Sequence, residues 1–264
     1  MKAKIIDQSI TKTYRKTIWK KTINAIDQYA LIKENDKIAI CISGGKDSFL
    51  LALVLREIKR HYKIKFELKY LVMDPGYDEK VMKQIKNNAE LFGLELEIFK
   101  TNIFDDIKKE VKPCYVCARK RRGHLYYQAR ELGCNKIALG HHFDDVIETL
   151  MLNILYAGSY GSMLPKLKAE HYPGMELIRP LYLVKEHDIL RWVKFNNLTF
   201  INCACAVADK KTDSKRQEMK ELIAALKKVY PDIDKNIFKS SENINLNTVL
   251  GYIDNEKHSF LDKY

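Results

Sequence analysis

The sequence lacks a long hydrophobic run. Its apolar stretches are far shorter than the roughly 18 residues that a membrane-spanning helix requires. The first residues, Met1-Lys2-Ala3-Lys4-Ile5-Ile6-Asp7-Gln8, contain no apolar core of a signal peptide. Internal repeats and low-complexity tracts are absent as well. We therefore expect a soluble, cytoplasmic protein that does not contact a membrane.

Cysteine is scarce, with six in 264 residues, whereas hydrophobic residues make up 46% of the chain. A chain of this length and composition can build a core without disulfide bonds. We therefore interpret the cysteines as reduced thiols or metal ligands. Cys41, inside an apolar run, and Cys134, between a predicted helix and a predicted strand, are interpreted as core residues.

Acidic residues are outnumbered, because 34 Asp and Glu face 46 Lys and Arg, for a net charge of +12. The basic residues are clustered. Residues 111–130 contain six Lys or Arg and no acidic residue, and residues 1–21 contain seven against Asp7 alone. Basic residues often do no more than solvate helix faces, but clusters of this kind favour a polyanionic partner, and nucleic acid is the natural candidate.

Strand-like and helix-like segments alternate along the chain. We predict strands at 37–42, 66–73, 95–100, 136–140 and 176–180, and helices at 14–30, 47–61, 79–92, 116–132, 144–157, 186–196 and 214–229. This alternation predicts an α/β fold, a twisted parallel sheet with helices on both faces, in which ligands bind at the carboxyl ends of the strands. We divide the chain into a basic helical segment (1–34), the α/β domain (35–230) and a polar tail (231–264).

The run Ser43-Gly44-Gly45-Lys46-Asp47-Ser48 lies between the first strand and the first helix of the domain. Unpaired N–H groups and the positive end of a helix dipole converge at such a place, which makes it an anion site. The spacing is not that of a Walker loop, which has four residues between its glycine and its Gly-Lys-Ser/Thr. We predict a phosphate cradle of another kind.

Two further strand ends bring polar residues to the same edge of the sheet. Asp74 follows the second strand, and Gly140-His141-His142-Phe143-Asp144-Asp145 follows the fourth and opens a helix. Two aspartates at a helix start can be simple caps. Beside a phosphate site they can also support Mg²⁺, which prefers a few carboxylates together with phosphate oxygens.

The cysteine spacing favours one kind of metal site over another. Structural zinc sites use two ligand pairs, each with two to four intervening residues. Cys114 and Cys117 fit that pattern, but Cys203 and Cys205 are separated by one residue and fit it poorly. An iron–sulfur cluster accepts thiolates from distant segments. If only three thiolates bind a 4Fe-4S cluster, one iron remains open to an external ligand such as hydrosulfide.

Several of these runs together resemble one protein family. They are Ser43–Ser48, Cys114-x-x-Cys117, Arg121-Arg122-Gly123-His124-Leu125-Tyr126, Gly140-His141-His142-x-Asp144-Asp145, Thr149-Leu150-x-Leu152-Asn153, Pro165-Lys166-Leu167, Ile178-Arg179-Pro180-Leu181 and Lys185-Glu186-x-Asp188-Ile189. Over roughly residues 15–225 the chain is similar to the tRNA 2-thiocytidine synthetases, the TtcA-like branch of the PP-loop ATP pyrophosphatase superfamily. The resemblance implies an enzyme that adenylates the C2 oxygen of an anticodon-loop cytidine, releases pyrophosphate, and replaces the oxygen with sulfur by means of a 4Fe-4S cluster.

The resemblance also implies roles for individual residues. The ATP-binding residues would be Ser43, Gly44, Gly45, Lys46, Asp47, Ser48, Asp74, Gly140, His142 and Asp145. The catalytic residues would be Lys46, Asp47, Cys114 and Cys117, with Asp47 and Asp144 supporting Mg²⁺. Cys114, Cys117 and Cys205 would hold the cluster, and Cys203 is the alternative third ligand. Arg119, Lys120, Arg121 and Arg122 would bind tRNA.

The chain departs from the family at the second cysteine segment, where Asn202-Cys203-Ala204-Cys205 replaces the usual Pro-Cys-x-x-Cys. This leaves open whether both cysteines bind, and whether another tRNA base or a small molecule is thiolated. Lysidine synthetase is an alternative that needs no Cys-x-x-Cys, and a non-catalytic tRNA-binding iron–sulfur protein is another. The implied partners are tRNA and a sulfur donor, either a cysteine desulfurase persulfide or sulfide. A second copy of the chain, forming a homodimer, is a further possible partner that the sequence leaves open.

Overall fold

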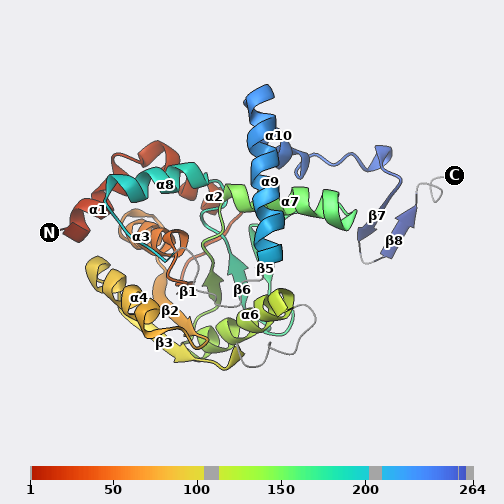
Figure 1. Ribbon diagram of the computed structural model, residues 1–264. Helices are drawn as coiled ribbons and strands as arrows, with labels where there is room; N and C mark the ends of the chain where they lie inside the picture. The colour runs from red at the N-terminus through yellow and green to blue at the C-terminus, as the bar shows by residue number, and fades with distance from the viewer. Residues whose placement is uncertain (1, 104–112, 202–209, 255, 260–264) are drawn as a thin grey trace. The chain divides into compact units, whose positions relative to one another are not determined.

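The computed structural model describes residues 2–103, 113–201, 210–254 and 256–259 (Figure 1). The helices are α1 (Lys2–Thr11), η1 (Arg15–Trp19), α2 (Lys20–Gln28), α3 (Lys46–His61), α4 (Glu79–Phe92), α6 (Pro113–Glu131), α7 (Phe143–Ala157), α8 (Glu186–Phe195), α9 (Lys210–Val229), α10 (Ile233–Ser240) and η2 (Leu246–Thr248). The strands are β1 (Lys37–Cys41), β2 (Glu67–Asp74), β3 (Leu96–Lys100), β4 (Lys136–Ala138), β5 (Lys166–Lys168), β6 (Glu176–Ile178), β7 (Gly251–Asp254) and β8 (Glu256–Ser259).

Six strands form one sheet in the order β3-β2-β1-β4-β6-β5. The pairs among β1, β2, β3, β4 and β6 are parallel, whereas β5 pairs antiparallel with β6 at the edge. The strand order reverses direction at β1, because β2 lies on one side of it and β4 on the other. A reversal of this kind opens a crevice at the carboxyl ends of the central strands. The predicted α/β fold with a parallel sheet is confirmed.

The central strands of this sheet are shielded from water on both faces, because their apolar residues are consecutive and do not alternate with polar ones. Ile38, Ala39 and Ile40 of β1 are fully buried, as expected of a strand covered on both faces. The helix that follows is equally apolar, and the residues from Phe49 to Leu55 in α3 are all fully buried. A helix that is hydrophobic all round belongs inside a protein, so the start of α3 is held firmly against the sheet.

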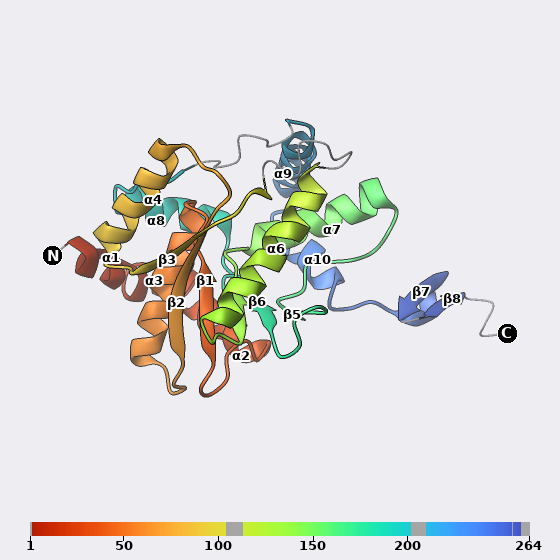
Figure 2. The ribbon, with the colours of Figure 1, turned by 90° about the horizontal axis from the view of Figure 1, so that it is seen from below.

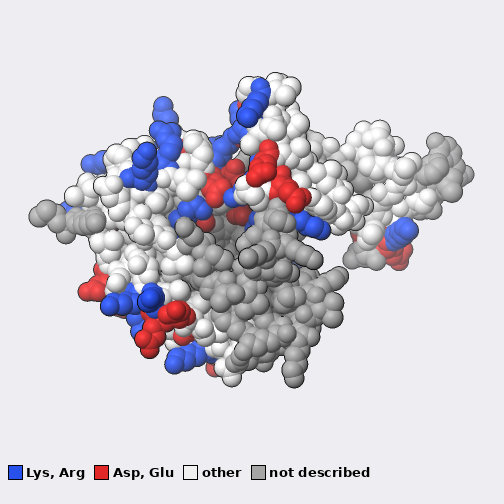
Figure 3. Space-filling view, in the orientation of Figure 1, with Lys and Arg blue, Asp and Glu red and all other residues white. Residues whose placement is uncertain are grey.

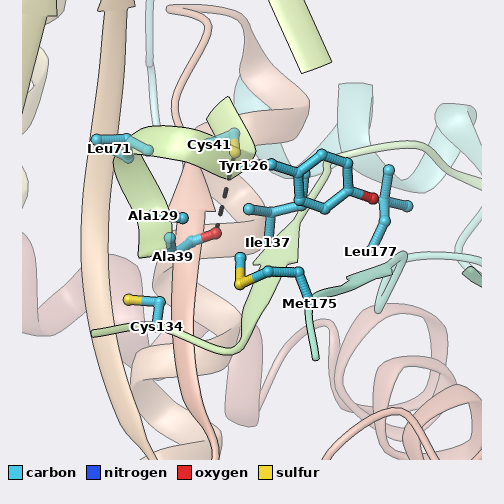
Figure 4. Close-up of a cluster of buried hydrophobic side chains, with 9 residues drawn as sticks. All are labelled: Ala39, Cys41, Leu71, Tyr126, Ala129, Cys134, Ile137, Met175 and Leu177. Atoms are coloured by element: carbon cyan, nitrogen blue, oxygen red, sulfur yellow. Dashed lines mark hydrogen bonds between the residues drawn. The ribbon is translucent and has the colours of Figure 1, made fainter. Parts of the chain in front are cut away.

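Helix α6 covers one face of the sheet, against β1, β2 and β4 (Figure 2). Alternate residues of a strand point to opposite faces, and Ala39 and Cys41 of β1 share a buried cluster with Tyr126 of α6 (Figure 4). Cys134 belongs to the same cluster. Both thiols are free, and burial raises the pKa of Cys41 to about 12. Their interpretation as core residues is confirmed.

The N-terminal helices begin earlier than the sequence predicts. Helicity was expected from residue 14, but α1 already spans Lys2–Thr11 and a π-helix, η1, separates it from α2. Ile6 and Ile10 of α1 are buried in the core. Asp7, also buried, accepts two hydrogen bonds from Arg56 of α3, at 2.7 and 2.8 Å. This pairing ties α1 to the central helix.

The chain divides into two compact units. The first comprises Met1–Val146 and Met163–Lys215 and contains the six-stranded sheet. The second comprises Ile147–Ser162 and Arg216–Tyr264, including α10 and the β7-β8 hairpin. None of the helices in the described ranges has the length and apolarity needed to cross a membrane.

Candidate nucleotide and sulfur-transfer site

The loop between β1 and α3 has the geometry of a phosphate cradle. Gly44 has a φ of 90°, a conformation open to glycine and costly for other residues. Gly45 occupies the N-cap of α3 without a side-chain hydrogen bond to the helix, so the first N–H groups remain available to an anion. Ser48 closes the loop, because its hydroxyl donates to Gly45 O at 2.9 Å and accepts from Ser43 N at 3.2 Å.

Gly140 brings the end of β4 against this cradle. A Cβ atom at Gly140 would lie 2.9 Å from the carbonyl carbon of Asp47 and 3.0 Å from the nitrogen of Ser48. Contacts that short leave room for hydrogen only, so the backbone after β4 touches the first turn of α3. This approach places the histidines and aspartates that follow Gly140 beside the cradle, as the sequence predicts.

Five ionisable side chains meet at the cradle. Lys46 Nζ lies 3.2 Å from Asp47 Oδ2 and 3.0 Å from Glu186 Oε1. His142, almost fully buried, lies with Nε2 3.9 Å from Asp47 Oδ1 and with Nδ1 3.4 Å from Asp145 Oδ2. The structure therefore brings together four of the predicted residues, and it adds Glu186, which the sequence analysis did not single out.

Asp47 presents an unsatisfied oxygen to this cluster. Its Oδ1 atom is buried and accepts no hydrogen bond from the described residues. Burial raises the pKa of Asp47, and the nearby charges of His142 and Lys46 offset this only in part. For Lys46 burial lowers the pKa, but the carboxylates of Asp47 and Glu186 outweigh it and the pKa is raised. A buried carboxylate oxygen without a donor suits a cation that arrives with the substrate.

Asp144 and Asp145 cap backbone groups at the same place. Asp145 Oδ2 accepts from His142 N at 2.9 Å, and Asp144 Oδ2 accepts from Glu186 N at 2.6 Å. The second bond joins the starts of α7 and α8. Among the described residues no group of three or more His, Cys, Asp or Glu is arranged to hold a metal by itself. Mg²⁺ usually takes several of its ligands from water and substrate phosphates, so the carboxylates fit such a shared site.

Asp74 shapes a neighbouring turn instead of joining the charged cluster. Its Oδ1 atom accepts from Gly76 N at 3.0 Å and from Tyr77 N at 2.8 Å. Tyr77 in turn accepts a hydrogen bond from Arg121 Nη2 at 2.8 Å. No hydrogen bond or ion pair within the described part of the chain links Asp74 to the cradle. The turn at Asp74 is thus connected to the basic helix α6.

The four basic residues of α6 differ in their surroundings. Arg119 and Arg122 are exposed, whereas Lys120 and Arg121 are half-buried. A second basic surface lies on the N-terminal helices, where Lys12, Arg15, Lys16, Lys20 and Lys21 are exposed. Figure 3 shows Lys and Arg gathered over these helices and α8, whereas over α4 they mix with Asp and Glu.

The cysteine side chains predicted to hold a cluster lie outside the described residues, but the backbone around them is partly described. Cys114 and Cys117 belong to the first turns of α6. Ile201, two residues before Cys203, donates from its nitrogen to Gly44 O at 3.3 Å. Its side chain also fills the space beside Gly44, since a Cβ there would lie 2.8 Å from Ile201 Cδ1. The segment that leads to Cys203 and Cys205 therefore starts at the cradle.

Sequence reasoning missed two residues at this edge of the sheet, Glu186 and Arg179, whose Nε atom donates to His141 Nδ1 at 3.3 Å. Each stands in a run that contributes to the family resemblance, but neither was assigned a role. Arg179 directly follows β6 and Glu186 opens α8. Their place in the sequence could have identified them, because residues that follow a parallel strand lie at the edge of the sheet where ligands bind.

Comparisons with known proteins identify the family of the chain. Residues 12–216 match the model of the PP-loop domain family. The chain is 37% identical over 237 residues to a tRNA-cytidine(32) 2-sulfurtransferase of Syntrophotalea carbinolica, which covers 88% of this chain and 90% of the relative. It is 35% identical over 237 residues to the enzyme of the same name from Geobacter metallireducens, and this match covers 88% of this chain and 91% of the relative.

A solved structure shares the fold. The U34-tRNA thiolase NcsA from Methanococcus maripaludis, solved with its 4Fe-4S cluster, superposes with a TM-score of 0.66 at 24% identity. The match covers 84% of this chain and 76% of the thiolase. At this identity the likeness concerns the α/β fold, which it supports independently of the sequence match.

Proposed function

The chain belongs to the tRNA-cytidine(32) 2-sulfurtransferase branch of the PP-loop family, and we propose that it is an ATP-dependent tRNA thiolase that acts on cytidine 32. The observation that carries the proposal is the cradle itself. Gly44, the uncapped start of α3 and the buried Oδ1 atom of Asp47 form a site for the phosphates of ATP together with a cation. We also propose that the enzyme works in the cytoplasm.

In the first step the C2 oxygen of cytidine attacks the α-phosphorus of ATP. A bond from that oxygen to phosphorus forms, the bond to the bridging oxygen breaks, and pyrophosphate leaves. The N–H groups of the cradle and the ammonium of Lys46 stabilise the charge on the departing pyrophosphate. Mg²⁺ at Asp47 and Asp144 would neutralise phosphate charge when bound. We assign ATP binding further to Ser43, Ser48, Gly140, His142 and Asp145.

In the second step a sulfur nucleophile attacks C2 and AMP leaves with the original oxygen. Adenylation is needed because an amide-like oxygen is a poor leaving group. Cys114, Cys117 and Cys205, with Cys203 as the alternative, would hold the cluster. The donor set fits, since thiolates from distant segments bind such clusters and the chain before Cys203 is anchored at the cradle. When bound, a 4Fe-4S cluster would supply the sulfur nucleophile for this step.

The test uses protein purified without oxygen, with ATP, substrate tRNA and sulfide. We expect AMP and pyrophosphate to be released together with 2-thiocytidine, detected by mass spectrometry of the digested tRNA. Iron and acid-labile sulfide are measured in parallel for wild type, Cys203→Ala and Cys205→Ala. Loss of iron in only one of the two variants supports a three-cysteine cluster. Lysine found on the cytidine, or stoichiometric zinc without iron, contradicts the proposal.

A further inference from the structure

Arg179 lies at the ligand-binding edge of the sheet but away from the cradle. It directly follows β6, which pairs with β4, and β4 pairs with β1. At the usual spacing of neighbouring strands, β6 is roughly 10 Å from β1. The backbone of Gly140 and His141 continues from β4, between these two strands. Arg179 therefore stands on the far side of the crevice from the phosphate cradle.

The charge of Arg179 is buried. The residue is 5% exposed. Its Nε atom donates to His141 Nδ1 at 3.3 Å and its Nη1 atom donates to Leu164 O, so both acceptors are uncharged. Within the described residues no ion pair involves Arg179. Burial, together with the charge of Arg122, lowers its pKa to about 10, although Tyr182, Tyr126 and Asp145 act in the opposite direction. A buried cation of this kind is costly unless an anion arrives.

Arg122 approaches the same place from α6. It stands one turn before Tyr126, and residues four apart lie on the same side of a helix. Tyr126 is packed against the sheet in the core, and the charges of both Arg122 and Arg179 act on its hydroxyl. Arg122 is exposed and forms no hydrogen bond or ion pair with the described residues. Its neighbour Arg121, by contrast, is bound to Tyr77.

We propose that Arg122 and Arg179 together bind one backbone phosphate of the tRNA, next to the nucleotide that is thiolated. This inference rests on the proposed function. Two neighbouring guanidinium groups that form no ion pair with the described residues make a site for an oxyanion, since each can donate two parallel hydrogen bonds to it. The phosphates of ATP are accounted for by the cradle at β1, two strands away. Of the two arginines, Arg122 is the exposed one, and it belongs to α6, the helix that contains the basic residues 119–122.

The first test compares two substitutions on one helix. Arg122→Met removes a member of the pair, and Arg130→Met removes an exposed arginine of α6 that lies over the ring of Tyr172, 5.6 Å from its centroid. Affinity for substrate tRNA is measured at several salt concentrations. We expect Arg122→Met to weaken tRNA binding about tenfold. The slope of log affinity against log salt concentration should become shallower by about one, as expected for the loss of one phosphate contact. Arg130→Met should stay close to wild type.

The second test concerns Arg179, which also supports Leu164. Arg179→Lys keeps the charge, and thermal unfolding shows whether the variant folds. Both arginines hold the same phosphate in this proposal. The double variant, Arg122→Met with Arg179→Lys, should therefore lose tRNA affinity by a smaller factor than the product of the factors lost by the two single variants. Affinity for a non-hydrolysable ATP analogue should not change in any variant.

Each other outcome contradicts the inference. Equal losses for Arg122→Met and Arg130→Met would mean that α6 contributes only diffuse charge. Weaker binding of the ATP analogue with unchanged tRNA affinity would mean that the pair serves the phosphates of ATP. These results leave the proposed function intact, whereas failure of wild type itself to bind tRNA would overturn the proposed function.

Discussion

At the scale of single residues, the site depends on a glycine that admits no side chain. The backbone of Gly140 touches that of Asp47 and Ser48, and backbone atoms cannot move aside as the end of a flexible side chain can. Gly140→Ala should therefore displace the start of α3. Overpacking of this kind costs about 1–3 kcal/mol, so we expect ATP affinity to fall about tenfold or more. Titration calorimetry with a non-hydrolysable ATP analogue measures it.

Gly123→Ala is the matched control. A Cβ atom at Gly123 would meet only the hydroxyl of Tyr172, at 3.9 Å, and alanine is favoured over glycine inside a helix. This variant should bind the analogue like wild type. Equal affinities for Gly140→Ala and wild type would show that the contact between β4 and α3 does not shape the cradle.

Sequence analysis identified the contiguous residues of the cradle most directly, whereas His142 and Asp145 were predicted from their place after a strand. Ser43–Ser48 form a motif between a strand and a helix, so their convergence follows from local geometry alone. Glu186 reaches Lys46 across 140 positions, and Asp74 turns toward its own loop. Neither fact follows from spacing, because each depends on how distant elements pack. Strand ends predict which edge a residue occupies, but not its partner there.

At the scale of elements, the opposite edge of the sheet contains a buried ionic network. Lys136 of β4 is 1% exposed. Its Nζ atom lies 2.8 Å from Asp36 Oδ2 and 3.0 Å from Glu176 Oε2, and it donates to Leu31 O at 2.9 Å. The network joins the loop before β1 to the starts of β4 and β6. We regard it as structural because it lies at the amino ends of the strands.

Lys136→Met tests this role. The substitution leaves Asp36 without the ammonium of Lys136, whereas Glu176 keeps Lys166, 3.3 Å away. Breaking a buried ion pair costs about 3–5 kcal/mol. Asp36 keeps a hydrogen bond from Asn135 at 2.8 Å, so we expect a loss near the lower figure. Urea unfolding measures the loss. ATP affinity of the folded variant should be unchanged, and a loss of ATP affinity would mean that the two edges are coupled.

The same network predicts a pH dependence of stability. Burial alone would raise the pKa of Glu176, but hydrogen bonds and charges from Lys136 and Lys166 outweigh it and lower the pKa below the model-compound value of 4.5. A carboxylate with a lowered folded pKa stabilises the fold above its unfolded value, and this contribution is lost as the pH falls through the folded pKa. The unfolding free energy of wild type should therefore decrease below about pH 4.5. In Lys136→Met this decrease should be smaller, and an equal slope in both proteins would contradict the argument.

The attachment of α1 to α3 is a second element-scale prediction. The Asp7–Arg56 pair is about nine-tenths buried, with side-chain exposures of 10% and 13%. The pair of Lys69 and Glu97 between β2 and β3 is about half exposed. We expect Asp7→Ala to lower the unfolding free energy by about 3 kcal/mol, and Glu97→Ala by less than about 1 kcal/mol. In Asp7→Ala, amide hydrogen exchange should show the loss of protection in α1. If Asp7→Ala and Glu97→Ala lowered the unfolding free energy by similar amounts, the difference that we expect between the buried and the exposed pair would be refuted.

The elements themselves were predictable to different degrees. The central strands and α3 have long apolar runs, and their ranges agree with the structure to within a few residues. Residues 1–34 were expected to be helical, but the bounds of α1 were missed because its apolar residues, such as Ile6 and Ile10, are few and stand among lysines. The edge strand β5 was missed because it has only three residues, Lys166–Lys168, and owes its form to pairing with β6.

At the scale of the whole molecule, the cysteines fall into two groups with different roles. Cys41 and Cys134 are buried in the core below the sheet edge, where burial raises the pKa of each thiol. A thiol held protonated is a poor metal ligand. The Cys-x-x-Cys pair starts α6, and the second pair follows Ile201, which is bonded to the cradle. We therefore propose that the second group, and not the first, serves the nucleotide site.

This division predicts that sulfur transfer can be separated from ATP chemistry. Cys117→Ser should abolish formation of 2-thiocytidine, because the cluster loses a ligand, while the ATP analogue and tRNA still bind. Cys134→Ala is the control; it should lower stability slightly, by about 1 kcal/mol for the small cavity, and keep thiolation. The measurements are iron content, thiolated nucleoside, and affinity for both substrates. If Cys117→Ser also lost ATP binding, the pair would be part of the fold that shapes the cradle, and the two halves of the reaction would not be separable in this chain.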